Sequence, residues 1–506
     1  MTATLLAAAG TYSTPVLDWH ALAPLVVLTV TLGLTVTLDA ILAERSSALL
    51  PNLVGLGLLG SLIPTLTLAI SDDRSREMLG GAFVVDRFAL MMTALFVVAG
   101  YVTVLLSTHY VAEGDYAEGE YYFLLLASVI GMVFMASARD LVSIFVALEL
   151  LSIPVYLLAG WRKRAKTGIE AGMKYYLIGV FASAVMLYGM SLIFGGTGET
   201  RLVEIGNAVN GSFGAEPVAV IGIVLTLVGF AFKVSAVPFH TWAPDTYEGA
   251  PTPVTAFLSV ASKAAGFAAL VTMVFLAFPG ADGVYGPFLW VLAALTMTGG
   301  NVLALRQTNI VRMLAYSSVS QGGFILMPLA VMASGDAAES ALKSVVIYLL
   351  IYAFSNLGAF AVIIAVSRKT RSGEISSFGG LMSYAPGMGL LMTIFLASLA
   401  GIPPLGIWIA QLQAFKTLLD AGDTAAYVLA VVAAVNTVIS AAYYMKVLRE
   451  MWMKPVPDGD TTPVVAPQPV WAALGICAAG TVVLGVLPSL VLRFADLPDL
   501  TSALGR

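Results

Sequence analysis

The chain has 506 residues, of which 59% are hydrophobic and only 11% are charged. A soluble domain carries about 25% charged residues, so this composition excludes a soluble globular protein and indicates an integral membrane protein. The formal net charge of −5 says little by itself, and we expect the lipid bilayer, not nucleic acid, as the partner of this surface.

Continuous apolar runs recur along the whole chain. A helix needs about 20 apolar residues to cross the hydrocarbon core, whereas a transmembrane barrel shows alternating strands of about ten residues. The runs are continuous, so we predict an all-α polytopic membrane protein with about 14 transmembrane helices in a single domain, 1–506. The predicted spans are 19–43, 49–70, 87–109, 119–137, 140–161, 170–195, 217–238, 252–278, 287–305, 309–333, 339–367, 386–420, 424–452 and 467–494.

Lys and Arg gather in the odd-numbered connections between these spans. The positive-inside rule places such connections in the cytoplasm, and an even number of spans then puts both termini on the outer side. The segment before the first span, 1–15, has no basic residue, so we expect no cleaved secretory signal. The odd connections hold Arg45, Arg162, Lys163, Arg164, Lys166, Arg306, Arg368, Lys369, Arg371 and Lys454, and the remainder hold Arg74, Arg76, Arg139, Arg201 and Arg506.

Helix-breaking sequence interrupts two of the predicted spans. The seventh contains KVSAVP at 233–238, and the twelfth contains GIPPLG at 401–406. Proline removes an intrahelical hydrogen bond, and in lipid such a break survives only where protein or water satisfies the freed carbonyls. The breaks lie five spans apart, which predicts two inverted five-helix repeats, roughly 119–278 and 287–452, around a transport site. The alternative is a pair of kinks that only shape packing.

Three ionisable residues, Glu149, Lys233 and Lys263, lie deep inside apolar spans. A charge at the bilayer centre costs about 2.5 to 3.5 kcal/mol. A buried carboxylate either takes a proton or finds a cation, and Lys233 is the candidate partner of Glu149 at similar depth. Because buried lysines exchange protons readily, we predict that the three residues handle protons or cations. The alternative is a static buried ion pair that fixes helix packing.

The other charged residues are weaker candidates. Lys174 follows Glu170 by four residues, which predicts a helix-surface pair or a side chain that reaches the membrane surface. His240 lies just past the seventh-span break, and we expect it in a cytoplasmic loop, where a lone histidine is more often structural than a proton carrier. Lys416 lies deeper in the twelfth span, and its role stays open.

The sequence shows no sign of a redox cofactor. It contains no phosphate-binding glycine loop, no cysteine cluster and no dinucleotide fingerprint. Its one cysteine, Cys477, excludes an intramolecular disulfide. We therefore expect this chain to bind no cofactor of its own.

The segment FAFKVSAVPFHTWAPDTYEGAPTPV, 230–254, resembles the signature of the antiporter-like membrane subunits of respiratory complex I. The resemblance extends to EAGMKYY at 170–176, LAYSS at 314–318 and LAGIPP at 399–404. The lysine in SKAAG, 262–266, is similar to the N-type members, where L-type and M-type members carry histidines. The length fits fourteen spans without the long lateral helix of the L type.

The resemblance implies a proton-translocating subunit of a bacterial NADH–quinone oxidoreductase in the cytoplasmic membrane. Such a subunit has no redox activity alone; NADH, FMN, iron–sulfur clusters and quinone would be bound by other subunits, and M-like, K-like and J-like subunits would be its neighbours. Glu149 and Lys233 would form a coupled pair, and Lys263 would pass protons along a central hydrophilic axis.

Two positions depart from the family pattern. The family's twelfth-span lysine aligns with Gln411, and Gln321 stands where histidine is frequent. Glutamine hydrogen-bonds water but holds no proton, and Lys416, five positions on, lies about 140° around the helix. These departures favour one alternative, a scaffold paralogue that moves no protons. A separate alternative is an antiporter-like subunit of a sodium/proton antiporter or membrane-bound hydrogenase. A stand-alone solute transporter fits least well.

Overall fold

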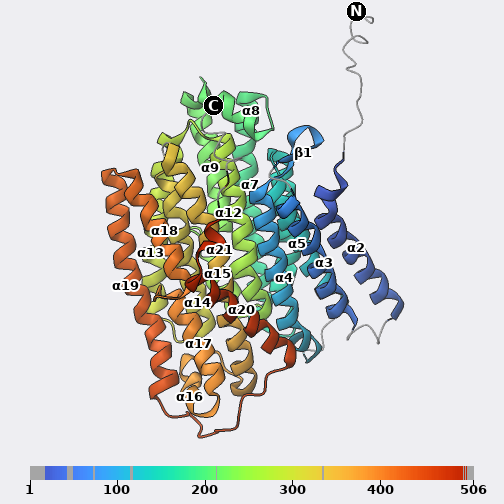
Figure 1. Cartoon of the computed structure of the whole chain (residues 1–506), viewed down its shortest axis with the longest axis vertical. Coiled ribbons are helices and arrows are strands. Elements are labelled where there is room, and N and C mark those ends of the chain that lie inside the picture. Colours follow the sequence, from blue (N-terminus) through green and yellow to red (C-terminus); the bar gives the residue numbers. More distant parts are fainter. Residues whose placement is uncertain are drawn as a thin grey trace, which may run out of the picture.

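The computed structural model describes residues 17–42, 49–71, 74–113, 118–211, 213–332, 335–493, 495 and 497. The described chain forms a bundle of helices that run roughly along one direction (Figure 1). Residues 1–15, which carry the expectation that no signal is cleaved, lie outside the described residues. Both ends of the chain, whose sides of the membrane were predicted, also lie outside them.

Each of the fourteen predicted spans corresponds to a helix or a broken helix of the structure, which confirms the all-α membrane architecture. Eleven helices in the described part of the chain are long and apolar enough to cross a membrane. The helices that match the spans are α2 (Trp19–Leu42), α3 (Leu49–Ser71), α4 (Arg87–Glu113), α5 (Glu118–Ser137), α6 (Leu141–Ala159), α7 (Lys166–Thr197), α9 (Pro217–Lys233), α11 (Thr252–Phe257) with α12 (Lys263–Thr272), α13 (Asp282–Leu305), α14 (Ile310–Leu326), α15 (Gly335–Thr370), α17 (Pro386–Leu399) with α18 (Gly406–Ala421), α19 (Thr424–Met453) and α20 (Gln468–Val486).

Shorter elements connect or extend these spans. The short helices are α8 (Leu202–Asn210), α10 (Trp242–Gly249), α16 (Leu381–Tyr384) and α21 (Ser489–Leu492), and single 3₁₀ turns cover Leu79–Gly81, Phe213–Ala215, Met327–Ala330 and Ile375–Phe378. Several helix starts are set by the sequence: the side chains of Asp140, Asn309 and Asp423 accept hydrogen bonds from the first free N–H groups of α6, α14 and α19. Such caps each stabilise a helix start by about 1 kcal/mol.

Both predicted helix breaks are present. Helix α9 ends at Lys233, and a turn leads to α10; α17 ends at Leu399, and α18 begins at Gly406. Each break contains a residue in the left-handed region, Ser235 with φ 60° and Gly401 with φ 76°. A non-glycine residue in that conformation is uncommon and often marks a functional site. The boundaries of the two inverted repeats stay a prediction.

A small β-hairpin was not predicted. Strands β1 (Arg76–Met78) and β2 (Phe83–Val85) pair antiparallel inside the polar connection after α3. Arg76 at its start forms an ion pair with Asp18, which caps α2 by accepting hydrogen bonds from His20 N and Ala21 N. The hairpin thus anchors one end of the first two helices.

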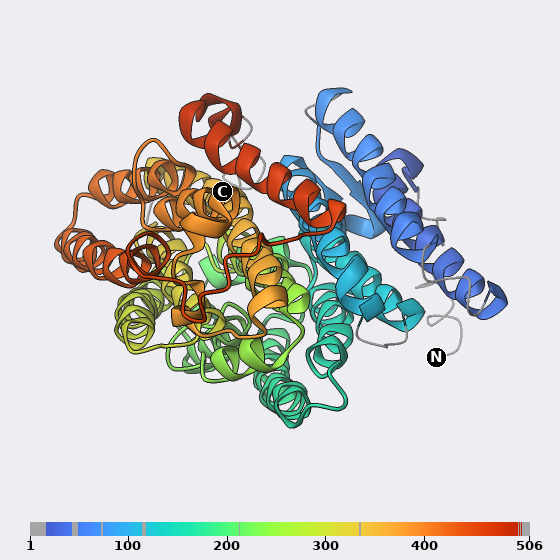
Figure 2. The same cartoon turned by 90° about the horizontal axis from the view of Figure 1, so that it is seen from below.

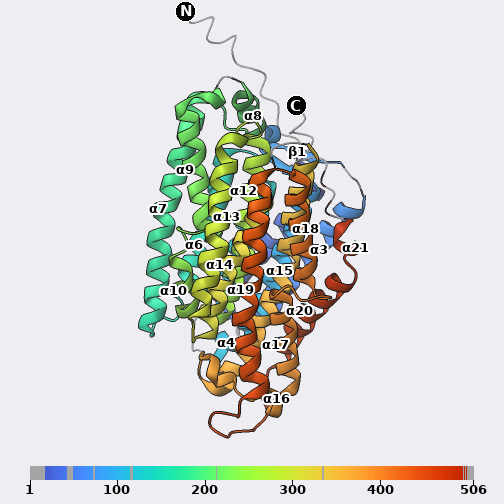
Figure 3. The ribbon, with the colours of Figure 1, turned by 90° about the vertical axis from the view of Figure 1, so that its left-hand side faces the viewer.

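Two elements form the centre of the bundle. The helical stretch 252–277, here called the central helix, consists of α11, a π-helical turn (Leu258–Ser262), α12 and a second π-helical turn (Met273–Ala277). All residues in the most apolar stretch of the central helix are buried. The share of buried residues in the corresponding stretch is 89% in α15, beside it, and only 17% in α2, at one edge of the bundle. Figure 2 shows α2 and α3 at one side of the bundle, and Figure 3 shows α7 and α9 on the side away from α20.

The bundle has two ends that the site description needs. The hairpin end holds β1–β2, α8 and the connection 422–423 between α18 and α19 (Figure 1). The basic end, opposite to it, holds the connections 160–166, 371–380 and 454–467, and Lys369 there donates to the carbonyls of Asp460 and Thr462. By the positive-inside expectation, the basic end faces the cytoplasm.

Candidate functional site

Lys233 is the last residue of α9 and is buried at the start of the first break. Its Nζ donates to Ser152 Oγ of α6 at 2.8 Å and lies 5.9 Å from the centroid of the Tyr175 ring. Its stem lies against the central helix, because a Cβ at Gly266 would come within 2.8 Å of Lys233 Cγ. The glycine therefore allows the close approach that holds the lysine in place.

Glu149 lies on α6 one turn before Ser152. Its Oε1 is buried without a hydrogen-bond partner, and among the described residues no ion pair joins it to Lys233. Lys233 therefore bonds to Ser152 and not to Glu149, and the role of Glu149 and Lys233 as a coupled pair stays a prediction.

Lys263 lies in the middle of the central helix and is 2% exposed. Its Nζ donates to the backbone O of Ser318 at 2.6 Å and to Ser318 Oγ at 2.7 Å. A Cβ at Gly322 would stand 4.0 Å from Lys263 Nζ and 3.3 Å from Val234 O. Lys263 thus bonds to α14, and its ammonium group lies on the same side of Gly322 as the carbonyl of Val234, the residue after Lys233.

A network of ion pairs covers the basic end beside α10. Lys174 pairs with Glu170 at 2.5 Å, the predicted helix-surface pair, and with Asp245 at 2.6 Å. Arg312 of α14 joins Asp245 at 2.8 Å and Glu248 at 2.9 Å. Sequence reasoning missed Asp245 and Glu248, although their spacing of three residues on one helix places both carboxylates on a shared face.

His240 lies past the first break and is half-buried. Its Nδ1 is buried without a hydrogen-bond partner, and its ring centroid lies 6.4 Å from that of Tyr316. The histidine is therefore not joined to either buried lysine by a hydrogen bond, and its structural role stays a prediction.

The second break is lined by neutral groups. Gln411 is 3% exposed, and its Nε2 is buried without a partner. A Cβ at Gly401 would come within 2.3 Å of Gln411 Oε1, so the left-handed glycine makes room for this side chain. Gln321 donates to Leu399 O at 3.0 Å and accepts a hydrogen bond from the Tyr348 hydroxyl. Both glutamines therefore lie at the end of α17.

Lys416 does not belong to this interior cluster. Its side chain is 61% exposed and pairs with Asp420 at 3.0 Å on the surface of α18. Gln411 and Lys416 thus face opposite environments, as their spacing around the helix predicts. No group of three metal-ligating side chains is found within the described ranges.

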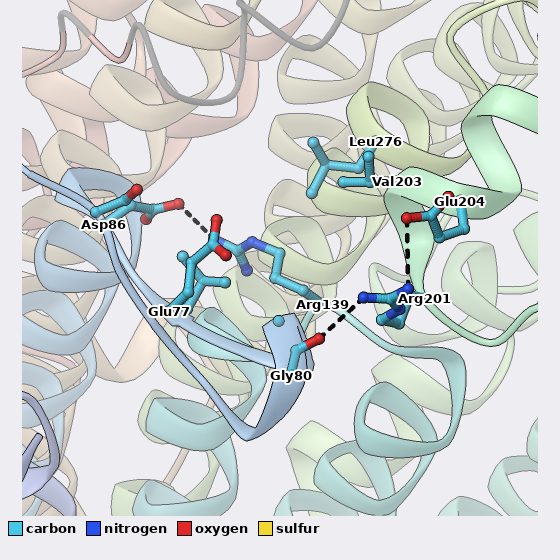
Figure 4. Close-up of a pocket in the computed structure, with 11 residues that line it drawn as sticks. Glu77, Gly80, Asp86, Arg139, Arg201, Val203, Glu204 and Leu276 are labelled. Carbon is cyan, nitrogen blue, oxygen red and sulfur yellow. Dashed lines mark hydrogen bonds and ion pairs between the residues drawn. The ribbon is translucent and has the colours of Figure 1, made fainter. Parts of the chain in front are cut away.

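A polar pocket of about 240 Å³ opens at the hairpin end (Figure 4). Arg139 is buried there and pairs with Asp86 at 2.6 Å. Arg201 donates to Gly80 O at 3.1 Å and pairs with Glu204 at 3.4 Å. The two arginines link the β-hairpin to the helices of the first half.

A larger cavity of about 630 Å³ lies at the basic end; we call it the vestibule. Its lining includes His109, Glu113, Glu248 and Arg368, and it reaches Thr252 at the start of the central helix. Arg368 also forms an ion pair with Glu113. The vestibule therefore brings titratable groups to the foot of the helix that carries Lys263.

Comparison with known proteins places this arrangement in a family. Residues 138–440 match the model of the transmembrane family described as NADH:quinone oxidoreductase/Mrp antiporter, and this segment contains both breaks and both buried lysines. The chain belongs to this family. A protein of Trichlorobacter lovleyi named NADH-quinone oxidoreductase subunit N is 43% identical over 82% of this chain and 83% of its own. A subunit N 1 of Herpetosiphon aurantiacus is 36% identical over 97% of this chain and 99% of its own.

Solved structures show the same fold. A chain of respiratory complex I from Thermus thermophilus is 31% identical, with a TM-score of 0.77 over 93% of this chain and 98% of that one. A chain of the Mrp complex from Dietzia is 21% identical, with a TM-score of 0.84 over 97% of this chain and 99% of that one. The second likeness concerns the fold alone.

Proposed function

We propose that this chain is a proton-translocating membrane subunit of a NADH–quinone oxidoreductase in a bacterial cytoplasmic membrane. The observation that carries the proposal is the pair of buried lysines, Lys233 and Lys263, each bonded to a serine hydroxyl in the core. Because a desolvated lysine releases its proton readily, these two groups serve as stations that take up and release protons.

The relatives support the assignment to a NADH–quinone oxidoreductase. Those at 36% and 43% identity bear the name subunit N of this enzyme. In such a complex this chain performs no redox chemistry; NADH, FMN, iron–sulfur clusters and quinone belong to other subunits. M-like, K-like and J-like membrane subunits are its proposed neighbours.

Protons enter through the vestibule at the basic end, which the positive-inside rule places in the cytoplasm. Glu248 lines the vestibule and is connected through Arg312 to Asp245 and Lys174. This network holds α7, α10 and α14 together at the basic end, beside the entry. His109 and Glu113 add two groups that can exchange protons with the cytoplasm.

Inside the bundle, the charge of Glu149 controls the proton on Lys233. A charged Glu149 favours the protonated form of Lys233, because opposite charges attract. Neutralisation of Glu149 removes that attraction, and the desolvated ammonium group then gives up its proton. Lys263, on the central helix that packs against the stem of Lys233, receives it. Gly266 of the central helix, three residues after Lys263, allows this helix to approach the stem of Lys233 closely.

The test is the isolation of the complex from its native membrane through a tag on this chain in mild detergent. We expect the co-purifying chains to include subunits that bind NADH, flavin and iron–sulfur clusters. Vesicles that contain the complex should acidify when NADH and a quinone are supplied. Co-purification with cation antiporter or hydrogenase subunits instead would assign the chain to another complex of the same fold.

A second candidate function, a scaffold that moves no protons, is favoured by the neutral residues Gln321 and Gln411. Its test is a Gln411→Lys variant compared with the parent for NADH-driven proton transport in vesicles. If the chain is a scaffold because it lacks this lysine, the parent should transport no protons and the Gln411→Lys variant should gain transport. If the parent already pumps and the variant shows no gain, the scaffold function is excluded.

A further inference from the structure

An apolar groove opens between α5, α6 and α7 near the basic end; we call it the lateral groove. Its volume is about 790 Å³, within the range of about 300 to 1,000 Å³ that is usual for small-molecule sites. Figure 3 shows α6 and α7 at the side of the bundle away from α20. The walls of the groove are apolar side chains from the three helices: Phe123, Leu124, Leu157, Ile169, Met173 and Tyr176.

The groove exists because two glycines form part of its floor. Gly160 at the end of α6 and Gly172 of α7 both line it, and a Cβ at Gly172 would come within 2.8 Å of Gly160 Cα. The two helices therefore touch through their backbones, and neither glycine adds a side chain to the space above the contact. On one wall the rings of Tyr156 and Tyr176 meet edge to face at 5.9 Å, which fixes the shape of that wall.

The walls are too exposed for a finished surface in water. Leu157 is 56% exposed, Met173 is 52% exposed and Tyr176 is 47% exposed. Ile169 and Tyr176 are seven residues apart, so the groove runs about 10 Å along the first part of α7. Because α7 starts at the basic end, the groove leads from the membrane surface into the hydrocarbon region. This length and direction fit the upper part of an acyl chain.

Trp161 stands at the mouth of the groove, two residues after the end of α6. It lines the groove, and its Nε1 is buried without a hydrogen-bond partner in the described chain. Tryptophan is enriched at membrane interfaces, where its ring lies in the apolar region and its N–H meets polar headgroups. The ammonium group of Lys163 lies 4.9 Å from the centroid of the Trp161 ring. The ring therefore holds one positive charge at the mouth.

The mouth also carries one negative charge. Glu120, in the first turn of α5, lines the groove together with Lys163. Within the described ranges neither side chain forms an ion pair, so one cation and one anion are left for a ligand. A phosphate with a primary amine beside it complements both charges. A purely anionic headgroup would satisfy Lys163 but would be repelled by Glu120.

We propose that the lateral groove binds one molecule of phosphatidylethanolamine from the leaflet at the basic end. One acyl chain lies against Leu157, Met173 and Tyr176. The lipid phosphate pairs with Lys163, the headgroup amine pairs with Glu120, and a lipid oxygen accepts the free hydrogen bond of Trp161. This site is separate from the buried lysines, and the inference does not depend on the proposed proton transport.

The test of the groove is photolabelling of the intact complex in mild detergent with phosphatidylethanolamine that carries a diazirine on one acyl chain. Mass spectrometry of peptides should place the label mainly within residues 156–176. Leu157→Trp fills the groove from an exposed position and should remove most of this label. The matched control is Leu187→Trp, because Leu187 is 45% exposed on α7 but does not line the groove; its labelling should equal that of the parent.

The test of the headgroup is competition by unlabelled lipid. Lys163→Gln should raise the phosphatidylethanolamine concentration that halves the labelling by about fivefold, the effect of one lysine at a membrane surface, and Lys163→Arg should restore it. Lys166→Gln is the control, because Lys166 belongs to the same basic connection but does not line the groove. Phosphatidylglycerol should compete less well than phosphatidylethanolamine in the parent, and Glu120→Gln should abolish this difference.

Three outcomes would overturn the proposal. The first is label in the groove that Leu157→Trp leaves unchanged; if that variant fails to assemble, Met173→Trp fills the groove from α7 and is read in the same way. The second is equal competition by the two lipids in the parent. The third is an adduct with a neighbouring subunit, instead of a lipid, from a photo-reactive residue introduced at position 173, because protein would then cover the groove.

Discussion

The two halves of the bundle differ in how they hold polar groups in the core. Among the described residues, the buried charged side chains are Asp86, Arg139, Asp140, Lys233 and Lys263. All of them lie in the first half of the chain or on the central helix. In the second half, the buried polar groups of the described residues are hydroxyls and amides, such as Ser344, Thr417 and Gln411. The same fold therefore holds a charged half, where the proposed proton stations lie, and a neutral half, where buried polar groups carry no charge.

The largest effect should come from the stations of the charged half. Lys233→Ala removes the ammonium group that binds Ser152, and Glu149→Ala removes the carboxyl group one turn before Ser152 on α6. Both variants should lose most of the proton transport that this chain contributes. Lys174 pairs with Glu170 and Asp245, and Lys446 of α19 donates to the backbone carbonyl of Gln307. Lys174→Ala and Lys446→Ala should therefore retain transport.

The measurement is the proton-to-electron ratio in vesicles at equal amounts of assembled complex. Equal losses of transport in all four variants would show that any of these substitutions disturbs transport. The buried Glu149 and Lys233 would then have no special role compared with Lys174 and Lys446.

The buried ion pair of the charged half should dominate stability. Arg139→Leu leaves Asp86 buried without its cation, which costs about 3 to 5 kcal/mol in comparable pairs. Arg201→Leu breaks a pair whose side chains are 50% and 40% exposed, and such pairs contribute about 0 to 1 kcal/mol. Thermal unfolding of the complex in mild detergent should show a clear loss for the first variant and little change for the second. Similar shifts for both would contradict the assignment of a buried charge.

The neutral half should be sensitive at its break. Gly401→Ala forces a side chain into a left-handed backbone, at about 1 to 2 kcal/mol, and places a Cβ against Gln411. Gly475→Ala is the control, because its Cβ would meet no atom within 4 Å and alanine favours a helix by about 1 kcal/mol. The temperature of thermal unfolding should fall in Gly401→Ala and rise slightly in Gly475→Ala. An unchanged unfolding temperature in Gly401→Ala would show that the break tolerates a side chain.

The smallest effect concerns pH and the β-hairpin. Burial acts to raise the pKa of Asp18, but hydrogen bonds from Ala21 N and Arg76 outweigh it, so its pKa lies below the ordinary value of 3.8. The stabilisation is therefore present above that value and is lost as the pH falls through the lowered pKa. Because the pair is partly exposed, we expect less than about 1 kcal/mol. Asp18→Asn should remove this increment at neutral pH; an unchanged acid-unfolding profile would contradict it.

Much of the fold follows from the sequence alone. The apolar runs predicted the fourteen spans, and the segments 233–238 and 401–406 predicted both breaks, because bilayer thickness and proline sterics act locally. The β-hairpin at 76–85 was missed, since its short strands lie in a polar connection with no periodic pattern.

The site was predicted only in part. Glu149, Lys233 and Lys263 stand out because a charge in an apolar run is rare. Their partners Ser152 and Ser318 do not stand out, because single serines are common in membrane helices and only tertiary packing brings them to the lysines.

The central claim is that protons gathered in the charged half reach the neutral half through Lys263, where the two halves meet. The most direct test is the proton-to-electron ratio of the complex with Lys263→Met, which keeps much of the side-chain length and removes the ammonium group. The account predicts a ratio as low as that of Lys233→Ala, with electron transfer retained. A parental ratio in Lys263→Met beside a lowered ratio in Lys233→Ala would show that protons leave this chain without crossing the central helix, and would contradict the account.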